Sequence, residues 1–498
     1  MCGLCAGCVP PQASYGAPVS RPPSTNRRPP PRGNRRSGNR TGGNRKSGVA
    51  KPRTPRALTP RAVAARALAS VLGSGQALES ALAGVPEFAA LEARDRAFVW
   101  RLLRAALRQL GQVDAALAPF VRRAPPAEAQ AVLRLGTVEL LVLRTPVHAA
   151  VGESVAAAES LGLGGFKGLV NAVLRKVADA GPGVMLQTPP KANIPGWLRA
   201  SWEEAYGGPA MRRIAAQMLK TPPLDLSVKG DPEAWAKTLG GEVVLGHTVR
   251  LSPERVAEAG DITQLPGFAD GAWWVQDAAA AIPARMLEVQ PGERVLDLCA
   301  APGGKTLQLA AAGARVTALD INGARLQRLH ANLARTGLAA EVVEADLFAW
   351  EPDAPFDAVL LDAPCTATGT LRRHPEVVHT KTPKTLSNLS KLQRRALARA
   401  SRWVAPGGRL VYAVCSLQPE EGEQQVERFL AGRGSAAQDG AAQDGAPRPE
   451  FRLNPVLTAK GVAVPSECIS GGQLRSLPHH MGGQGGMDGF FAARLDRA

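Results

Sequence analysis

Residues 294–320 read RVLDLCAAPGGKTLQLAAAGARVTALD, and they alternate short apolar runs with a glycine-bearing loop and a helix-forming run. The two outer runs are rich in Val and Leu, which is typical of buried strands, while TLQLAAAG (306–313) favours a helix. A strand, a helix and a second strand in this order form the repeating unit of a parallel sheet with helices on its faces. The stretch therefore predicts an α/β domain built on a doubly wound sheet.

The same alternation continues along the chain as far as residue 416. The expected strands are RVLDL (294–298), RVTALD (315–320), EVVEAD (341–346), FDAVLLD (356–362) and RLVYAVCS (409–416). The expected helices between them include GARLQRLHANLARTG (323–337) and TLSNLSKLQRRALARASRWV (385–404). Ligands of such sheets bind at the carboxyl ends of the strands. The chemically interesting side chains all fall at those ends: Asp297, Asp320, Asp346, Asp362 with Cys365, and Cys415.

Further regions surround this domain, which we place at residues 271–498. Residues 57–182 repeat apolar residues at helical spacing, broken by Gly or Pro, and predict a small all-helical domain. Residues 183–270 mix a helix-like run with an alternating run, and we expect a small α+β connector. Residues 1–56, rich in Pro, Gly, Asn and Arg, and the region of a tandem AAQDG repeat at about 432–448 are expected to be disordered.

The charge of the chain points to a polyanionic partner. The 498 residues carry a formal net charge of +17, which favours nucleic acid first and an anionic membrane surface second. Much of this excess is local, because 12 basic residues and no acidic residue lie between Arg21 and Arg56. A solvated tail and an RNA-tethering arm are about equally good interpretations of this segment.

The composition limits the cellular setting and the metal chemistry. No segment reaches the roughly 18 to 20 apolar residues of a membrane helix, and MCGLCAGCVPPQ has no basic leader, so we expect a cytoplasmic protein. Seven cysteines in a chain of this length favour free thiols over a disulfide framework. The triplet Cys2, Cys5 and Cys8 lacks a fourth partner, and no His/Cys cluster has zinc spacing, so no metal is expected.

The glycine loop predicts a nucleoside ligand. Pro302, Gly303 and Gly304 follow a strand and precede a helix start, so the backbone can approach a ligand closely. Asp320 ends the second strand, where a carboxylate can accept both hydroxyl groups of a ribose. Neither the GxxxxGK[ST] nor the GxGxxG pattern is present, which disfavours a phosphate loop and a nicotinamide dinucleotide. A purely structural tight turn remains the alternative.

The paired cysteines suggest a reaction on a pyrimidine ring. A lone thiol at a strand end is usually a small buried hydrophobe, and we interpret Cys299 and Cys468 in that way. Cys365 and Cys415, by contrast, end strands that we expect to be adjacent beside the nucleoside site. A thiolate that adds to carbon 6 of a pyrimidine makes carbon 5 nucleophilic. Carbon 5 could then take a methyl group from a sulfonium cofactor.

The helical domain shows a resemblance of its own. DRAF (95–98), LRLGTVELL (133–141), PVHAAVGESV (146–155) and KGLVNAVLR (167–175) resemble the NusB fold, a helical RNA-binding module. Most of these residues are expected to serve helix packing. The polar set at helix ends, His148, Asn171 and Arg175, is less easily explained by packing.

The carboxyl half resembles the RNA cytosine-C5 methyltransferases in DLCAAPGGKT (297–306), DAPCTATGTLRRHPEV (362–377), VYAVCSLQPEE (411–421) and DGFFAARL (488–495). RRHP together with the NusB-like half is similar to the bacterial RsmB (Sun) type, which modifies 16S ribosomal RNA. The resemblance implies a Rossmann-like methyltransferase domain that uses S-adenosylmethionine. It also implies a ribosomal RNA partner, and we expect a monomer.

The resemblance assigns roles to individual residues. It makes Cys415 the nucleophile and Cys365 the thiol that assists product release, and it puts Asp362 at the methyl and base end. The ribose of the cofactor would lie on Asp320 and its adenine near Asp346. The rest of the cofactor would contact the loop residues Cys299, Ala300, Ala301, Pro302, Gly303, Gly304 and Lys305.

The chain departs from the family pattern at Val414, where threonine is usual, at Gly422, where asparagine is usual, and at Thr366, where serine is common. The lost hydroxyl of residue 414 could alter thiolate activation. Two alternatives stay open: the same chemistry on transfer RNA or 23S ribosomal RNA, and a non-catalytic RNA-binding assembly or antitermination factor whose active site has decayed.

Overall fold

The computed structural model of the protein describes residues 58–432, 450–455 and 464–498. The predicted basic arm and nearly all of the predicted insertion lie outside the described residues. No helix among the described residues is long and apolar enough to cross a membrane.

The first described region is entirely helical, as its apolar spacing predicts. Its α-helices are α1 (Pro60–Ser74), α2 (Leu78–Ala83), α3 (Pro86–Ala90), α4 (Ala93–Arg108), α5 (Leu110–Leu117), α6 (Ala127–Leu141), α7 (Val147–Ser160), α8 (Lys167–Ala180) and α9 (Gly183–Leu186). The Thr59 hydroxyl caps the start of α1 by accepting from the Ala62 amide, and Gly75 ends that helix with a φ of 69°. Helices α1 and α6 supply much of the buried apolar core.

The helices of this region pack closely around α6. A Cβ on Gly136 of α6 would lie 2.5 Å from Cδ1 of Leu174 on α8 and 2.8 Å from Oγ of Ser154 on α7. Three helices therefore meet where α6 carries no side chain. The polar set His148, Asn171 and Arg175 is exposed, and Nε of Arg175 donates to Oδ1 of Asn171 over 3.2 Å.

Helix α10 (Gly196–Met218) leads out of the helical region as two helical runs. The segment IPGWLRASWEEAYG (194–207) predicts a helix that glycine caps, and Gly207 does interrupt the helix, with a φ of 80° and a ψ of 156°. A second helical run follows directly, with Pro209 near its start. Trp202 is fully buried on the first run and Met211 on the second.

The connector is a small antiparallel sheet with two helices. Its strands lie in the order β2-β3-β1-β4, and its elements are β1 (Leu224–Val228), α11 (Pro232–Leu239), β2 (Glu242–Val244), β3 (Thr248–Leu251), α12 (Pro253–Ala259) and β4 (Trp273–Val275). The buried ion pair of Arg250 with Asp225 joins β3 to β1 at 2.7 Å. Asp225 also accepts from the amide of Ala278, which ties the connector to the start of α13.

The large sheet forms the centre of the remaining residues. Its parallel half has the order β9-β8-β5-β6-β7, and β13, β12, β11 and β10 add antiparallel strands at the β9 side. The parallel half comprises β5 (Arg294–Leu298), β6 (Arg315–Asp320), β7 (Glu341–Glu344), β8 (Phe356–Asp362) and β9 (Val404–Val414). The antiparallel strands are β10 (Phe451–Asn454), β11 (Ile469–Ser470), β12 (Gln473–Ser476) and β13 (Phe490–Arg497).

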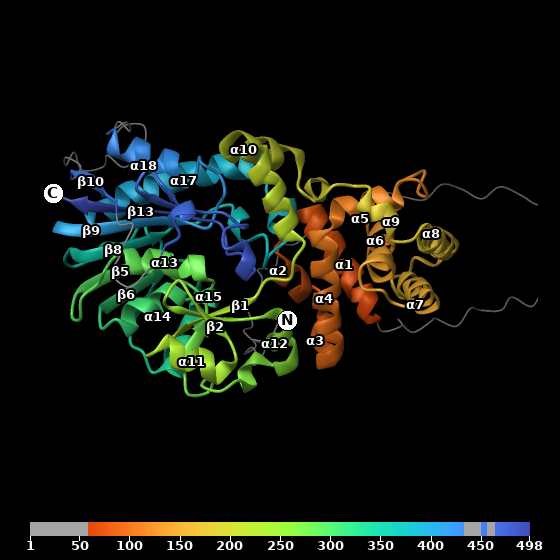
Figure 1. Ribbon diagram of the computed structural model, residues 1–498, viewed down its shortest axis with the longest axis horizontal. Helices are drawn as coiled ribbons and strands as arrows, with labels where there is room; N and C mark the ends of the chain where they lie inside the picture. Colours follow the sequence, from red (N-terminus) through yellow and green to blue (C-terminus); the bar gives the residue numbers. More distant parts are fainter. Residues whose placement is uncertain (1–57, 433–449, 456–463) are drawn as a thin grey trace, which may run out of the picture. The chain divides into compact units, whose positions relative to one another are not determined.

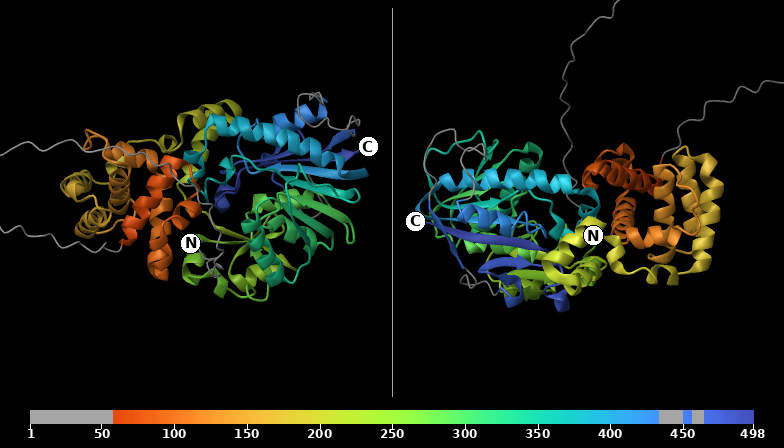
Figure 2. Two further views of the ribbon diagram at one scale, coloured as in Figure 1. Left: turned by 180° about the vertical axis from the view of Figure 1, so that it is seen from behind. Right: turned by 90° about the horizontal axis from the view of Figure 1, so that it is seen from above.

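Helices cover both faces of this sheet, as Figures 1 and 2 show. One face packs α13 (Ala278–Met286), α14 (Gly304–Ala311) and α15 (Gly323–Thr336), and the other packs α17 (Pro383–Arg402) and α18 (Glu423–Leu430). The short α16 (Val377–Thr380) precedes α17.

The Rossmann-like α/β fold is thereby confirmed, with one correction. The sheet is mixed rather than parallel, because DGFFAARL forms most of an antiparallel strand beside β9. The motif alternates less clearly than a half-exposed strand does, since both faces of β13 are buried from Phe490 to Ala493.

Candidate active site

The two cysteines lie together at the carboxyl ends of neighbouring strands. Strands β8 and β9 pair in parallel, with Asp362 opposite Ala413, as we expected. Cys365 and Cys415 follow the ends of these strands, and their Sγ atoms are 3.5 Å apart. Both thiols are partly exposed. A hydrogen bond with Cys415, followed by burial, raises the pKa of Cys365 well above its usual range, so Cys365 is held as a thiol.

Val414 does not face the Cys415 thiol. Its side chain packs in the apolar cluster on the α17 face, against which Cys365 also packs, whereas Cys415 packs against the cluster on the α13 face. Side chains alternate between faces along a strand, so residues 414 and 415 point in opposite directions. A hydroxyl at position 414 would lie in that apolar core, on the side of Cys365 rather than of Cys415.

The other two departures also fit their surroundings. A Cβ on Gly422 would lie 2.5 Å from Nη2 of Arg475 and 2.8 Å from Cγ of Phe491, so a side chain there would require both neighbours to move. The Thr366 hydroxyl donates to a carboxylate oxygen of Glu421 over 2.5 Å, a bond that serine could also make.

A lysine and an aspartate lie beside the thiols. Nζ of Lys305, from the first turn of α14, is 2.7 Å from Oδ2 of Asp362 at the end of β8. Burial is the largest influence and opposes the charge of Lys305, but Asp362, Cys415 and Asp297 together outweigh burial and raise the pKa of the ammonium group. The pair offers both hydrogen-bond donors and acceptors at the mouth of the site. Lys305 stood in our sequence prediction only as a loop residue, and its pairing with Asp362 was missed.

The loop at residues 299–305 joins β5 to α14 in a tight turn. Cys299 has a φ of 59° and Gly303 a φ of 105°, and a Cβ on Gly303 would lie 2.3 Å from Cδ1 of Leu329. Only glycine fits there without displacing α15. Ala300 and Ala301 are buried beneath the loop, and Pro302 is exposed. Burial raises the pKa of the Cys299 thiol to about 12, although the residue is partly exposed rather than fully buried.

The three acids at the ends of β5, β6 and β7 differ in burial. Burial raises the pKa of Asp297 to about 7, and one of its oxygens has no hydrogen-bond partner among the described residues. Asp320 is only 3% exposed and accepts from the amides of Ala301 and Asn322, so it is not the freely accessible carboxylate that a strand end suggests. Asp346 is exposed and accepts from the Phe348 amide.

These observations fit an adenosine-bearing cofactor. The unpartnered oxygen of Asp297 can accept from an ammonium group. Oδ1 of Asp320 accepts from the Asn322 amide and retains acceptor capacity for a ribose hydroxyl, whereas Oδ2 also pairs with Arg325. The glycine turn leaves room for close approach of a ligand to the first amides of α14. Among the described residues, no group of three or more His, Cys, Asp or Glu side chains could hold a metal ion.

A buried cluster of ion pairs lies next to the site, and the sequence analysis did not predict it. Arg372, 1% exposed, lies 2.7 Å from Asp277 and 3.2 Å from Asp488, and Arg373 also contacts Asp488. The cluster joins RRHP, DGFF and the start of α13. Burial disfavours the charge of Arg373, yet Asp488, Asp277 and Cys415 together raise its pKa. The adjacent arginines of RRHP were the feature of the sequence that could have indicated this cluster.

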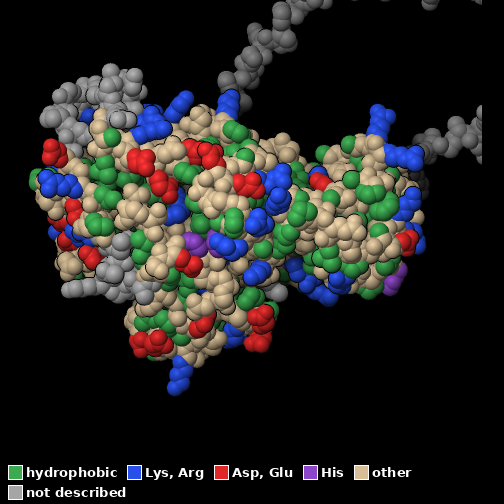
Figure 3. All heavy atoms as spheres, turned by 45° about the horizontal axis from the view of Figure 1, so that its top comes forward, with side chains coloured by type: hydrophobic (Ala, Val, Ile, Leu, Met, Phe, Trp, Pro, Cys, Tyr) green, Lys and Arg blue, Asp and Glu red, His purple; other side chains and the backbone are tan. Residues whose placement is uncertain are grey.

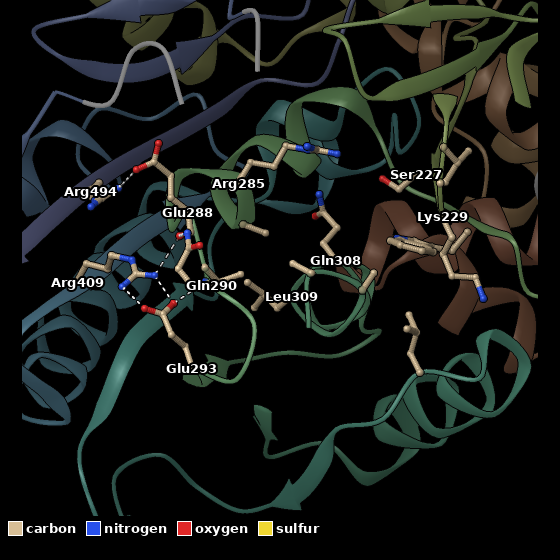
Figure 4. Close-up of a pocket in the computed structure, with 18 of the residues that line it drawn as sticks. Ser227, Lys229, Arg285, Glu288, Gln290, Glu293, Gln308, Leu309, Arg409 and Arg494 are labelled. Carbon is tan, nitrogen blue, oxygen red and sulfur yellow. Dashed lines mark hydrogen bonds and ion pairs between the residues drawn. The ribbon is translucent and has the colours of Figure 1, made fainter. Parts of the chain in front are cut away.

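A separate cavity of about 820 Å³ lies on the opposite side of the large sheet, near the amino ends of its parallel strands (Figure 4). Arg409 pairs with Glu293 at 2.5 Å, and Arg494 pairs with Glu288 at 2.9 Å. These residues lie at the amino ends of the parallel strands or beside them. The cavity is therefore remote from the thiols, which lie at the carboxyl ends.

The fold and the site define a Rossmann-like methyltransferase with two neighbouring thiols, joined to a NusB-like helical domain. The 16S rRNA methyltransferase RsmB/F family matches residues 284–496, and the NusB family matches residues 58–179. Ribosomal RNA small subunit methyltransferase B of Xanthomonas campestris is 38% identical over 73% of this chain and 85% of its own. The protein of that name from Pseudomonas syringae is 35% identical over 86% of this chain and 94% of its own.

The crystal structure of PH0851 shares the fold, with a TM-score of 0.66 over 89% of this chain and 100% of that chain at 24% identity. The chain belongs to the RsmB/F family of 16S rRNA methyltransferases. It is a methyltransferase that uses S-adenosylmethionine, as we expected from the sequence.

Proposed function

We propose that this protein methylates carbon 5 of a cytosine in 16S ribosomal RNA through a covalent adduct with Cys415. The observation that carries the proposal is the 3.5 Å separation of the Cys365 and Cys415 sulfurs beside the Lys305 and Asp362 pair. A nucleophile, a second thiol, a cation and a carboxylate in one place are the groups that this reaction needs.

The target base must leave its stack to reach these groups. Asp362 is 28% exposed and Lys305 is 10% exposed, so the aspartate is the more accessible member of the pair. In our proposal Asp362 accepts from the amino group of the cytosine, and the Lys305 ammonium donates to a ring nitrogen or oxygen. The two side chains orient the ring and stabilise the charge that develops on it.

The covalent steps use both cysteines. The Cys415 thiolate forms a bond to carbon 6, and the electron pair of the carbon 5–carbon 6 double bond makes carbon 5 nucleophilic. When bound, S-adenosylmethionine supplies an electrophilic methyl group, and carbon 5 takes that methyl. Solvent water takes the proton from carbon 5, and the electron pair of that carbon–hydrogen bond restores the double bond as the bond from carbon 6 to sulfur breaks. Cys415 leaves as a thiolate that accepts a hydrogen bond from the Cys365 thiol.

Two cations, Lys305 and Arg373, interact with Cys415. Burial lowers the pKa of Lys305, Asp362 raises it most, and attraction to Cys415 raises it further. Cys415 contributes in the same direction to Arg373, after burial and the two aspartates of the buried cluster. A thiolate between two cations is the reactive form of cysteine.

The helical domain is the proposed ribosomal RNA contact. Arg101, Arg122, Arg123, Arg175 and Lys176 are exposed on it, and Figure 3 shows Lys and Arg side chains outnumbering Asp and Glu on this part of the visible face. Exposed basic residues bind phosphates without reading sequence, so they favour RNA but do not select a nucleotide. Transfer RNA and 23S ribosomal RNA remain the alternative substrates.

Alanine variants of the two cysteines test the mechanism. With a 16S RNA substrate, Cys415→Ala is expected to abolish both methyl transfer and the covalent protein–RNA complex. Cys365→Ala is expected to transfer the methyl group once and then accumulate the complex on a denaturing gel. Cys468→Ala, a buried thiol away from the site, is the control and should match the unchanged protein. A complex formed by Cys415→Ala but not by Cys365→Ala would reverse the two roles.

The RNA target needs a separate measurement. Bisulfite sequencing of ribosomal and transfer RNA should show one cytosine of 16S RNA that loses protection in a deletion strain and regains it when the gene is restored. A lost site in transfer RNA or 23S RNA, with 16S RNA unchanged, would refute the 16S assignment while leaving the chemistry intact.

A further inference from the structure

Glu421 is a carboxylate buried directly behind the two thiols. It lies between β9 and α18 and is fully buried. One of its oxygens accepts from the Thr366 amide and from Nε2 of Gln393, each over 2.9 Å. The other accepts from the hydroxyl groups of Thr366 and Ser416, each over 2.5 Å. A buried carboxylate with four donors is strongly restrained in position.

The partners of Glu421 are the residues that directly follow the two cysteines. Thr366 follows Cys365 and Ser416 follows Cys415, so one carboxylate holds both loops. A second set of bonds runs in parallel: the Gly369 amide donates to the carbonyl of Cys415 over 3.0 Å, and the Leu417 amide donates to the Thr368 hydroxyl over 3.0 Å. The separation of the sulfurs therefore depends on a network in which Glu421 is the shared acceptor.

We propose that Glu421 is the positioning residue of the cysteine pair: it fixes the two thiol loops against each other and places a negative charge next to Cys365, so that Cys365 remains the hydrogen-bond donor while Cys415 ionises. The proposal rests on the proposed function, in which the two thiols have different roles.

The charges around the two thiols are arranged asymmetrically. The hydrogen bond with Cys415 and burial raise the pKa of Cys365 most, and the charge of Glu421 adds to the shift. The cations Lys305 and Arg373 interact instead with Cys415. Two cysteines with similar backbone positions are thus placed in different electrostatic surroundings, and Glu421 supplies part of the difference.

Two substitutions separate the charge of Glu421 from its hydrogen bonds. In Glu421→Gln the amide oxygen can accept from Thr366 and Gln393, and the amide NH₂ can donate to the two hydroxyl oxygens, so the shape remains and the charge is lost. In Glu421→Ala both are lost. Glu427→Gln, on the exposed face of α18, is the matched control for removal of one negative charge.

The first experiment measures the thiol without RNA. In a Cys415→Ser background, alkylation of Cys365 by iodoacetamide is followed by mass spectrometry across a pH series. Glu421→Gln should shift the midpoint of alkylation to lower pH, because removal of the negative charge stabilises the thiolate. Glu427→Gln should leave the midpoint unchanged. An unshifted midpoint in Glu421→Gln would overturn the electrostatic part of the proposal, whatever the mechanism of methylation.

The second experiment measures release from RNA. As the pH rises, Glu421→Gln should accumulate the covalent complex where the unchanged protein and Glu427→Gln do not, because ionised Cys365 no longer donates to the leaving sulfur. Glu421→Ala should also slow formation of the complex at every pH. A parallel measurement on Cys365→Ala tests the proposed function itself. If Cys365→Ala accumulates the complex while Glu421→Gln behaves like the unchanged protein, the proposed function stands and the role of Glu421 is refuted. Equal losses in all steps, with a lower melting temperature and no pH shift, would show a merely structural residue.

Discussion

The large sheet carries charged residues at both ends of its parallel strands, which we call the carboxyl edge and the amino edge, but it arranges them differently at the two. At the carboxyl edge, Asp297 has an oxygen without a partner among the described residues, and two thiols lie 3.5 Å apart. At the amino edge, the cavity of about 820 Å³ is lined by ion pairs such as Arg409 with Glu293. Perturbed groups with spare bonding capacity mark a reactive site better than an open volume does.

Similar ion pairs have different surroundings at the two edges. Lys305 at the carboxyl edge and Arg409 at the amino edge both contact a carboxylate, at 2.7 Å and 2.5 Å. Lys305 is paired with an aspartate that is open to a substrate, whereas Arg409 closes a pair that also bonds the backbone of the α13 to β5 loop.

The largest expected effect comes from exchanging the cation at each edge. Lys305→Met should lower kcat/KM for RNA methylation on the order of 100-fold, because Asp362 loses its partner and the base loses a donor. Arg409→Met, at the amino edge, should leave kcat/KM within about twofold, since rim ion pairs contribute little. Single-turnover methyl transfer with labelled cofactor measures both. Equal losses in the two variants would remove the distinction between the edges.

The next effect concerns stability and pH. Burial raises the pKa of Asp297 to about 7, so the folded protein holds a proton there that the unfolded chain loses near pH 4. The stability that this proton contributes is full below about pH 4 and is lost as the pH rises to about 7. Asp297→Asn should remove this dependence and gain a few kcal/mol relative to the unchanged protein near pH 8. Thermal melts across that pH range measure it.

Exposed Asp346→Asn is the control for this experiment and should show no such pH dependence. A flat difference between Asp297→Asn and the unchanged protein from pH 4 to 8 would show that Asp297 ionises normally in the fold.

The sequence was sufficient for the parallel half of the sheet because buried parallel strands are continuous apolar runs. RVLDL, RVTALD and FDAVLLD coincide with β5, β6 and β8. It was insufficient for β13, where burial on both faces hides the alternation of a half-exposed strand. Long-range packing decided this element, and a single sequence does not report it.

The sequence was sufficient to predict which strand ends form the candidate site, but not which side chains pair with one another there. Register places Cys365 and Cys415 together once β8 and β9 are recognised as neighbours. The partners of Lys305 and Glu421 depend on side-chain directions in loops, for which no periodicity exists. The burial of Asp320 likewise follows from α15 and the glycine loop closing over it, and it changes the variant that should be used to test the cofactor site.

Substitution of Asp320 is therefore expected to affect both cofactor binding and stability. Asp320→Ala should weaken S-adenosylmethionine binding about tenfold and also destabilise the fold by about 1 to 3 kcal/mol, because the amides of Ala301 and Asn322 lose a buried acceptor. Asp346→Ala, on an exposed strand end, should weaken binding less and leave stability nearly unchanged. Calorimetry and thermal melts together separate the two losses. Normal affinity in a destabilised Asp320→Ala protein would limit Asp320 to shaping the loop.

The smallest effect is expected at the amino edge. Glu293 is 22% exposed at its side chain and accepts from Arg409; burial raises the pKa of its carboxyl group, but Arg409, the Gln290 amide and Arg494 together outweigh burial and lower it. Glu293→Gln can keep one oxygen as the acceptor for the Gln290 amide, but it loses the charge and one of the two oxygens that accept from Arg409, so it should cost about 0.5 to 1 kcal/mol of stability at neutral pH. The cost should disappear as the pH falls through the lowered pKa and should shrink at high salt. Methylation should be unchanged, whereas a loss of activity without a loss of stability would show that the amino edge takes part in function.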